Sequence, residues 1–135
     1  NATDAELAAL EQMVAAEAAM KDSPEMMFEH NRLFHRFIYR AARNRYLTRF
    51  LQSIYDTLTA YRSISTMHMP ARREAVLHEH HALCTALANR DEAAANRAAV
   101  DHVRAALRAR MQIEHASLLD SVPKRPRRSK SVAKV

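Results

Sequence analysis

The chain has no glycine among its 135 residues, and this absence restricts its fold more than any other feature. Tight hairpin turns rely on residues that adopt positive φ, which glycine does at the lowest cost. Only four prolines are present, while alanine, leucine, arginine and glutamate are abundant. A chain of this kind cannot easily make a hairpin-rich sheet, so we expect an all-α fold.

Capping signals and apolar periodicity predict five helices, over residues 4–21, 24–43, 46–63, 71–88 and 92–121. Thr3 and Glu6 form a capping box at the start of the first helix. Ser23 and Asp91 are expected as the N-caps of the second and fifth helices. Asn44 is expected to end the second helix, because asparagine tolerates the left-handed conformation when no glycine is available.

The third helix is expected to bury an apolar face, because its apolar residues recur every three or four positions. They are Leu47, Phe50, Leu51, Ile54, Leu58 and Tyr61.

The length fits a single domain, which we assign to residues 1–121, followed by a basic tail over residues 122–135. Subtracting the six tail cations from the net charge of +6 leaves a formally neutral body. The tail has no periodicity and repels itself, so we expect it to be disordered, or alternatively to bind nucleic-acid phosphates without sequence preference. Its cations are Lys124, Arg125, Arg127, Arg128, Lys130 and Lys134.

The single cysteine, Cys84, excludes an internal disulfide framework and suits a reducing, cytoplasmic environment. No apolar run approaches the length of a membrane helix, and no signal peptide is visible. The first residue is Asn1 rather than methionine, so we expect that an upstream segment is missing.

Two polar side chains lie on the apolar face of the second helix. Asn31 and His35 are four residues apart, hence one helical turn, and they share a face with Met27 and Phe34. Buried polar groups need partners, and a shared metal ion would satisfy both. For this pair alone, however, a hydrogen-bonded core histidine is the better explanation.

Two further histidines strengthen the metal hypothesis. His80 and His102 fall on the apolar faces of the fourth and fifth helices, so three helices each direct one imidazole inward. Imidazole binds zinc, nickel, copper and iron, and three from one bundle leave coordination positions open. The other five histidines lie off these faces or in a loop and are expected at the surface: His30, His68, His78, His81 and His115.

An ordered set of short motifs resembles the FCD effector-binding domain of FadR-type GntR transcription regulators. The set covers nearly all of residues 3–119, and its histidines His80 and His102 are 22 residues apart, as in that family. The motifs are Asn31-x-x-Phe-His35, Ala41-Ala-Arg-Asn44, Arg72 leading to Glu79-His80-His-Ala-Leu83, Ala86-Leu-Ala-Asn-Arg-Asp91-Glu-Ala-Ala-Ala95, and Asp101-His102.

The resemblance implies a bundle of antiparallel helices, usually dimeric, that binds a divalent metal, with zinc or nickel expected. It carries the ligand roles to Asn31, His35, His80 and His102. Asn31 departs from the family, which more often has aspartate there, and a neutral amide is a weaker ligand for a cation.

In such domains a small organic acid contacts the metal, and Arg72 and Asn44 match positions that would contact this effector. For Asn44 a helix cap is the better explanation, whereas for Arg72 a first-turn surface position is an equally good one. DNA would be bound only by a winged-helix domain, which should lie upstream together with the family's first effector-domain helix.

Two alternatives to a sensor domain stay open. A helical metalloenzyme would use the open metal to activate water, which needs a general base. Glu79 and Asp101 each adjoin a histidine of the set in sequence and are therefore expected to point elsewhere, so we expect that the chain is not an enzyme. The other alternative is a dimerising helical protein with structural histidines and a nucleic-acid-binding tail.

Overall fold

The computed structural model describes residues 2–59 and 65–121, which form five α-helices and two short 3-10 helices without a strand. The predicted all-α fold is confirmed, and the helix bounds agree within a few residues where they are described. The elements are α1 (Asp4–Glu17), η1 (Ala18–Met20), α2 (Pro24–Ala41), α3 (Arg45–Thr59), η3 (Thr66–His68), α4 (Pro70–Ala88) and α5 (Glu92–Ser121). The predicted tail and the end of the predicted third helix lie outside the described residues.

The predicted N-caps are confirmed. Thr3 Oγ1 accepts the backbone N–H of Glu6 at 3.2 Å, and the Glu6 carboxylate accepts the backbone N–H of Thr3 at 2.7 Å. The side chains of Ser23 and Asp91 each accept the N–H three residues further on. These bonds satisfy donors that have no partner within the helix, so short polar side chains fix where α1, α2 and α5 begin.

The turn between α2 and α3 differs from the expectation, because Arg43 rather than Asn44 adopts the left-handed conformation, with φ of 57°. Asn44 instead caps α3, and its Oδ1 accepts the N–H of Leu47 at 3.0 Å. Arg90 takes the same conformation after α4, with φ of 56°. A chain without glycine thus uses arginine at both turns, and Arg43 is held there by an ion pair to Glu6 at 3.1 Å.

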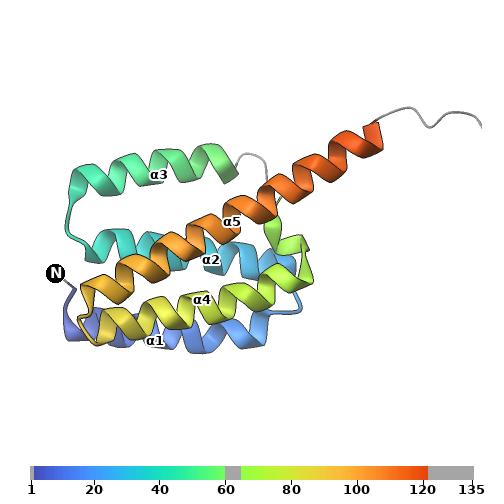
Figure 1. Ribbon diagram of the computed structural model, residues 1–135. Coiled ribbons are helices and arrows are strands. Elements are labelled where there is room, and N and C mark those ends of the chain that lie inside the picture. Colours follow the sequence, from blue (N-terminus) through green and yellow to red (C-terminus); the bar gives the residue numbers. More distant parts are fainter. Residues whose placement is uncertain (1, 60–64, 122–135) are drawn as a thin grey trace, which may run out of the picture.

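Consecutive helices run in opposite directions, as the resemblance implied (Figure 1). The α4 helix packs against both α1 and α5, and α2 packs against α1 and α3. The α5 helix continues well past the ends of the other helices (Figure 1). This arrangement surrounds a central core with α1, α2, α4 and α5.

The core combines apolar packing with one ring contact that matters for the site. Leu10, Phe34, Leu83 and Cys84 form a buried cluster that joins α1, α2 and α4. Phe34 is fully buried, and its ring stacks on the imidazole of His80 with centroids 3.9 Å apart. The histidines are therefore continuous with the core rather than placed at its edge.

Most of the described apolar face of α3 is exposed, which corrects the expectation for this helix, while Leu51 is half-buried and the side chains of Leu58 and Tyr61 lie outside what the structure describes. Phe50 is 63% exposed, and Leu47 and Ile54 are also exposed. The α3 helix stands apart from the bundle and packs mainly on α2 (Figure 1). Periodicity shows which residues share a face, but it does not show whether anything in the same chain covers that face.

Along the described part of the chain, no helix combines the length and the apolar character needed to cross a membrane.

Candidate metal centre

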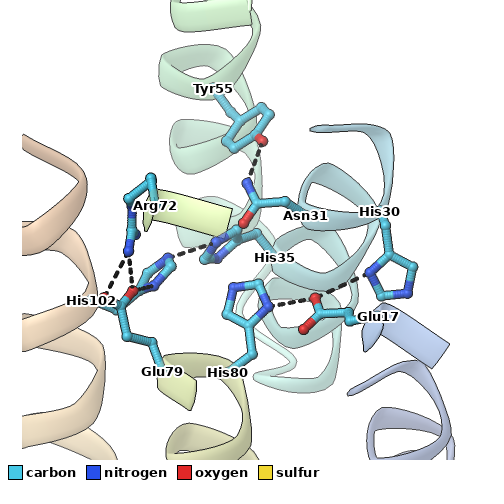
Figure 2. A network of polar contacts seen from close by, with 9 residues as sticks. All are labelled: Glu17, His30, Asn31, His35, Tyr55, Arg72, Glu79, His80 and His102. Carbon is cyan, nitrogen blue, oxygen red and sulfur yellow. Dashed lines mark hydrogen bonds and ion pairs between the residues drawn. The ribbon is translucent and has the colours of Figure 1, made fainter. Parts of the chain in front are cut away.

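Three helices bring together the three histidines that the sequence singled out. His35 comes from α2, His80 from α4 and His102 from α5, and one ring nitrogen of each lies within 4.8 Å of the other two. The Nε2 atoms of His35 and His102 are 3.0 Å apart. His80 is fully buried and His102 is 5% exposed, whereas His35 is half-buried. Figure 2 shows the rings turned toward a common point.

A buried carboxylate that the sequence analysis missed holds His80 in place. Glu17, at the end of α1, is fully buried, and its Oε1 accepts hydrogen bonds from His80 Nδ1 at 2.6 Å and from His30 Nδ1 at 3.1 Å. Burial alone would raise the pKa of Glu17, but these two hydrogen bonds lower it below the ordinary value. Glu17 follows Leu10 and Val14 on the inner face of α1, so its position on an apolar face was the available signal.

His30 is likewise a correction, because it was expected at the surface and is only 9% exposed. It lies three residues after Met27 and four before Phe34 on the inner face of α2, and its ring reaches Glu17. The buried face of α2 is therefore wider than the predicted apolar face that contains Asn31 and His35.

A second carboxylate holds His102. Glu79 Oε2 accepts from His102 Nδ1 at 2.7 Å, and the Nη1 of Arg72 donates to both oxygens of Glu79 at 2.7 and 2.8 Å. Burial would raise the pKa of Glu79, and the bonds from His102 and Arg72 outweigh it and lower the pKa.

Two expectations about the neighbours of this pair need correction. Glu79 was expected to point away from the site, yet successive residues of a helix differ by about 100° in direction. The α4 helix lies between α1 and α5, so it directs His80 toward Glu17 and Glu79 toward His102. Asp101, by contrast, is exposed. The alternative of Arg72 as a surface residue is also wrong, because it is 5% exposed.

The hydrogen-bond partners indicate the tautomers of the three rings. Ionised carboxylates only accept, so His80 and His102 carry their protons on Nδ1 and present lone pairs on Nε2. His35 then donates from Nε2 to His102. Burial, with smaller contributions from His102, His80 and Arg72, lowers the pKa of His35 to about 3. The bond from His35 occupies the lone pair of His102 Nε2, so a metal ion held by both Nε2 atoms would require His35 to carry its proton on Nδ1 instead. Neutral imidazoles are the form that binds metal ions.

The Asn31 side chain is oriented by Tyr55 of α3. Its Nδ2 donates to the Tyr55 hydroxyl at 3.2 Å, while its Oδ1 is buried and accepts no hydrogen bond from any described residue. Burial raises the pKa of Tyr55 to about 12, so the hydroxyl stays protonated and neutral. In Figure 2 the amide oxygen lies on the side of His35, away from Tyr55.

The buried atoms that lack partners are consistent with a cation among these side chains. Within the described residues, His80 Nε2 and Asn31 Oδ1 are buried without a hydrogen-bond partner. Each unpaired buried acceptor costs about 1–3 kcal/mol, and a metal ion is a partner that accepts lone pairs from both. The donor set, three imidazole nitrogens and an amide oxygen, suits zinc or nickel.

Two predicted site residues, Arg72 and Asn44, do not contact the histidines directly in the bonds that the structure describes. The Arg72 Nη1 atom is engaged by Glu79, and its buried Nε has no partner among the described residues. Asn44 is exposed and caps α3. A hollow of about 410 Å³ lies near the α4–α5 turn, lined by Leu10, Ile38 and Leu87 among others, and none of the three histidines lines it.

The fold and the cluster define a class of protein: a helical bundle with a buried, carboxylate-supported histidine centre. A family profile for the FCD domain matches residues 1–105, which is most of the chain. The chain therefore belongs to the FCD domain family, as the sequence motifs implied. This family points to the ligand-sensing part of a GntR-type regulator rather than to an enzyme. Comparisons with curated proteins and with solved structures gave no match.

Proposed function

We propose that this chain is the effector-binding domain of a FadR-type GntR transcription regulator and that it senses a small organic acid through a bound divalent metal. The observation that carries the proposal is the convergence of His35, His80 and His102, each from a different helix, within 4.8 Å. Their supporting carboxylates, Glu17 and Glu79, are typical of metal-binding histidines, which usually give their second nitrogen to an acceptor.

In this proposal His35, His80 and His102 hold the ion through their ring nitrogens, and Asn31 adds its amide oxygen. Zinc or nickel is the expected metal, because imidazole-rich sites suit both. The metal supplies a positive charge to which a carboxylate can bind. Arg72 is a candidate second contact for that carboxylate, and Asn44 a weaker one, since it is engaged as a cap.

A catalytic role is not favoured by the carboxylates around the site. Glu17 and Glu79 are both occupied as acceptors from imidazoles, which makes them supports for the rings rather than free general bases.

The chain is further proposed to act as a cytoplasmic homodimer. The exposed apolar face of α3 is the surface that a second copy would cover, because contiguous exposed apolar residues mark interaction sites. Sequence-specific DNA contact is expected from an upstream winged-helix domain. Differential affinity of the effector for two arrangements of the assembly is then sufficient for switching.

The proposal is tested by thermal denaturation with metal and small acids added separately and together. A ligand that binds only the folded state raises the melting temperature by mass action. Zinc or nickel should raise it alone, and a recognised acid should raise it further only when the metal is present. An acid that stabilises the chelator-treated protein equally well would show that the metal does not carry the binding.

A further inference from the structure

The fourth candidate donor, Asn31, is the only one that is neither an imidazole nor a charged group. Its amide nitrogen is tied to the Tyr55 hydroxyl at 3.2 Å, which leaves the oxygen as the atom that faces the histidines. An amide whose nitrogen faced the centre would present donors to a cation and could not bind it. The Tyr55 contact therefore selects the orientation that can bind a metal (Figure 2).

The charges of the two carboxylates that hold the imidazoles, and of the arginine paired with one of them, can be counted directly. Glu17 and Glu79 each carry −1 and Arg72 carries +1, so with neutral histidines these side chains amount to −1. A divalent ion brings the centre to +1, because Asn31 adds no charge. A carboxylate in place of that amide would bring it to zero.

We propose that Asn31, held by Tyr55, lowers the metal affinity of the centre and raises its affinity for a singly charged organic anion. This inference deepens the proposed function, on which it rests, by naming a monocarboxylate as the effector class. A buried +1 charge is costly, and a monoanion that reaches the metal neutralises it. The metal ion would accept an oxygen of that anion only if it bound more than the four donors that the three histidines and Asn31 would supply.

Tyr55 is a positioning residue in this account, and its effect depends on what stands at position 31. A carboxylate accepts a metal through either oxygen, so it does not need a partner that fixes its orientation. Tyr55→Phe should therefore weaken metal binding when residue 31 is Asn and have little effect in the Asn31→Asp background. If Tyr55 only supported the packing of α3, Tyr55→Phe would lower the metal affinity equally with Asn and with Asp at position 31.

The experiment uses the full chain, freed of metal with a chelator and reloaded with Co²⁺, whose visible absorption reports coordination number. Co²⁺ affinity is measured first, and acetate is then titrated into the loaded protein. The variants are Asn31→Asp, Tyr55→Phe and the double variant. Tyr39→Phe is the matched control, because its ring centroid is 6.1 Å from that of His35, against 6.3 Å for Tyr55.

Asn31→Asp is expected to bind Co²⁺ at least about tenfold more tightly and acetate at least about tenfold more weakly than the wild type. Tyr55→Phe alone is expected to lose about tenfold in Co²⁺ affinity, and Tyr39→Phe to lose little. Equal or tighter acetate binding by Asn31→Asp, or no response of the loaded wild type to acetate, would overturn the inference. If Asn31→Asp does not fold, the comparison of Tyr55→Phe with Tyr39→Phe decides, and equal losses in the two would overturn it.

His80→Ala separates this inference from the proposed function. If His80→Ala bound Co²⁺ as tightly as the wild type does, the proposal that these histidines form a metal centre would be rejected. If His80→Ala lost Co²⁺ binding but Asn31→Asp bound acetate as the wild type does, the metal centre would be supported and only the role of Asn31 would be rejected.

Discussion

His80 and Glu17 are 63 residues apart in the sequence, yet His80 Nδ1 lies 2.6 Å from Glu17 Oε1, and both side chains are excluded from solvent. The contact joins the end of α1 to the middle of α4 inside the bundle. It sets the tautomer of His80 and directs its Nε2 to the cluster. The first helix of the chain, α1, thus takes part in the site although it contributes no candidate ligand.

Replacing this carboxylate by its amide should weaken the centre. Glu17→Gln keeps the size of the side chain, but it removes the negative charge and one acceptor that orient His80 and His30. Loss of such a support typically costs about 10–100-fold in metal affinity. Competition with a coloured chelator measures this, with Glu11→Gln on the exposed side of α1 as the control. Equal affinities in the two variants would show that Glu17 is only a packing residue.

Acidification should destabilise the metal-free protein before its carboxylates titrate. The folded state holds the pKa of His35 at about 3, below its ordinary value of 6.5, because burial disfavours the charged ring. Between these values the unfolded chain binds the extra proton, so stability falls as pH decreases from 6.5 toward 3. The contribution lost at pH 5 is about 2 kcal/mol.

Urea denaturation at pH 7 and pH 5, with chelator present, checks this. His35→Gln has no group that titrates at this position and should show a smaller difference between the two pH values. The same difference in wild type and His35→Gln would assign the pH dependence to other residues.

Because the Phe34 ring stacks on His80 inside the core, truncating Phe34 should strongly destabilise the fold. Phe34→Ala opens a cavity in the buried cluster and should lower the free energy of unfolding by about 3–5 kcal/mol. Phe50→Ala, on the exposed face of α3, should cost the monomer less than about 1 kcal/mol. Denaturant titration of dilute protein compares them, and similar costs would contradict the assignment of the core.

The exposed face of α3 predicts how the chain self-associates. Phe50→Asp should shift the protein toward monomer, because a charge on an apolar contact surface is costly to bury. Light scattering at several concentrations measures this. Leu107→Asp, on the outer side of α5 and also exposed, is the control, and a larger effect of Leu107→Asp would move the interface from α3 to α5.

The sequence predicted the fold well, because helix caps are local. Thr3, Ser23 and Asp91 cap helices through bonds to backbone groups three residues away, which a sequence displays directly. The three histidines were also predictable, since each lies on an apolar face. Glu17 and His30 were missed because an acidic or basic residue is expected at the surface until its partner from another helix is known.

The sequence predictions that were wrong concern which face of a helix meets which neighbouring helix. Glu79 was misplaced because its direction depends on α4 lying between α1 and α5, which is a tertiary fact. The apolar face of α3 was expected inside for the same reason, because the spacing of its residues does not reveal that α3 packs mainly on α2. The contact of Asn31 with Tyr55 joins residues 24 apart through this same α2–α3 arrangement and was likewise out of reach.

The most direct test of the account is the metal content of three proteins purified and reloaded identically: the wild type, His80→Ala and His81→Ala. His81 is the next residue on α4 and is exposed, so its removal controls for unspecific binding by surface imidazoles. The account predicts about one zinc or nickel ion per chain in the wild type and in His81→Ala, and a large loss in His80→Ala, because a chelating donor is gone. Equal metal content in His80→Ala and the wild type would contradict it and leave the histidines as hydrogen-bonded members of the core.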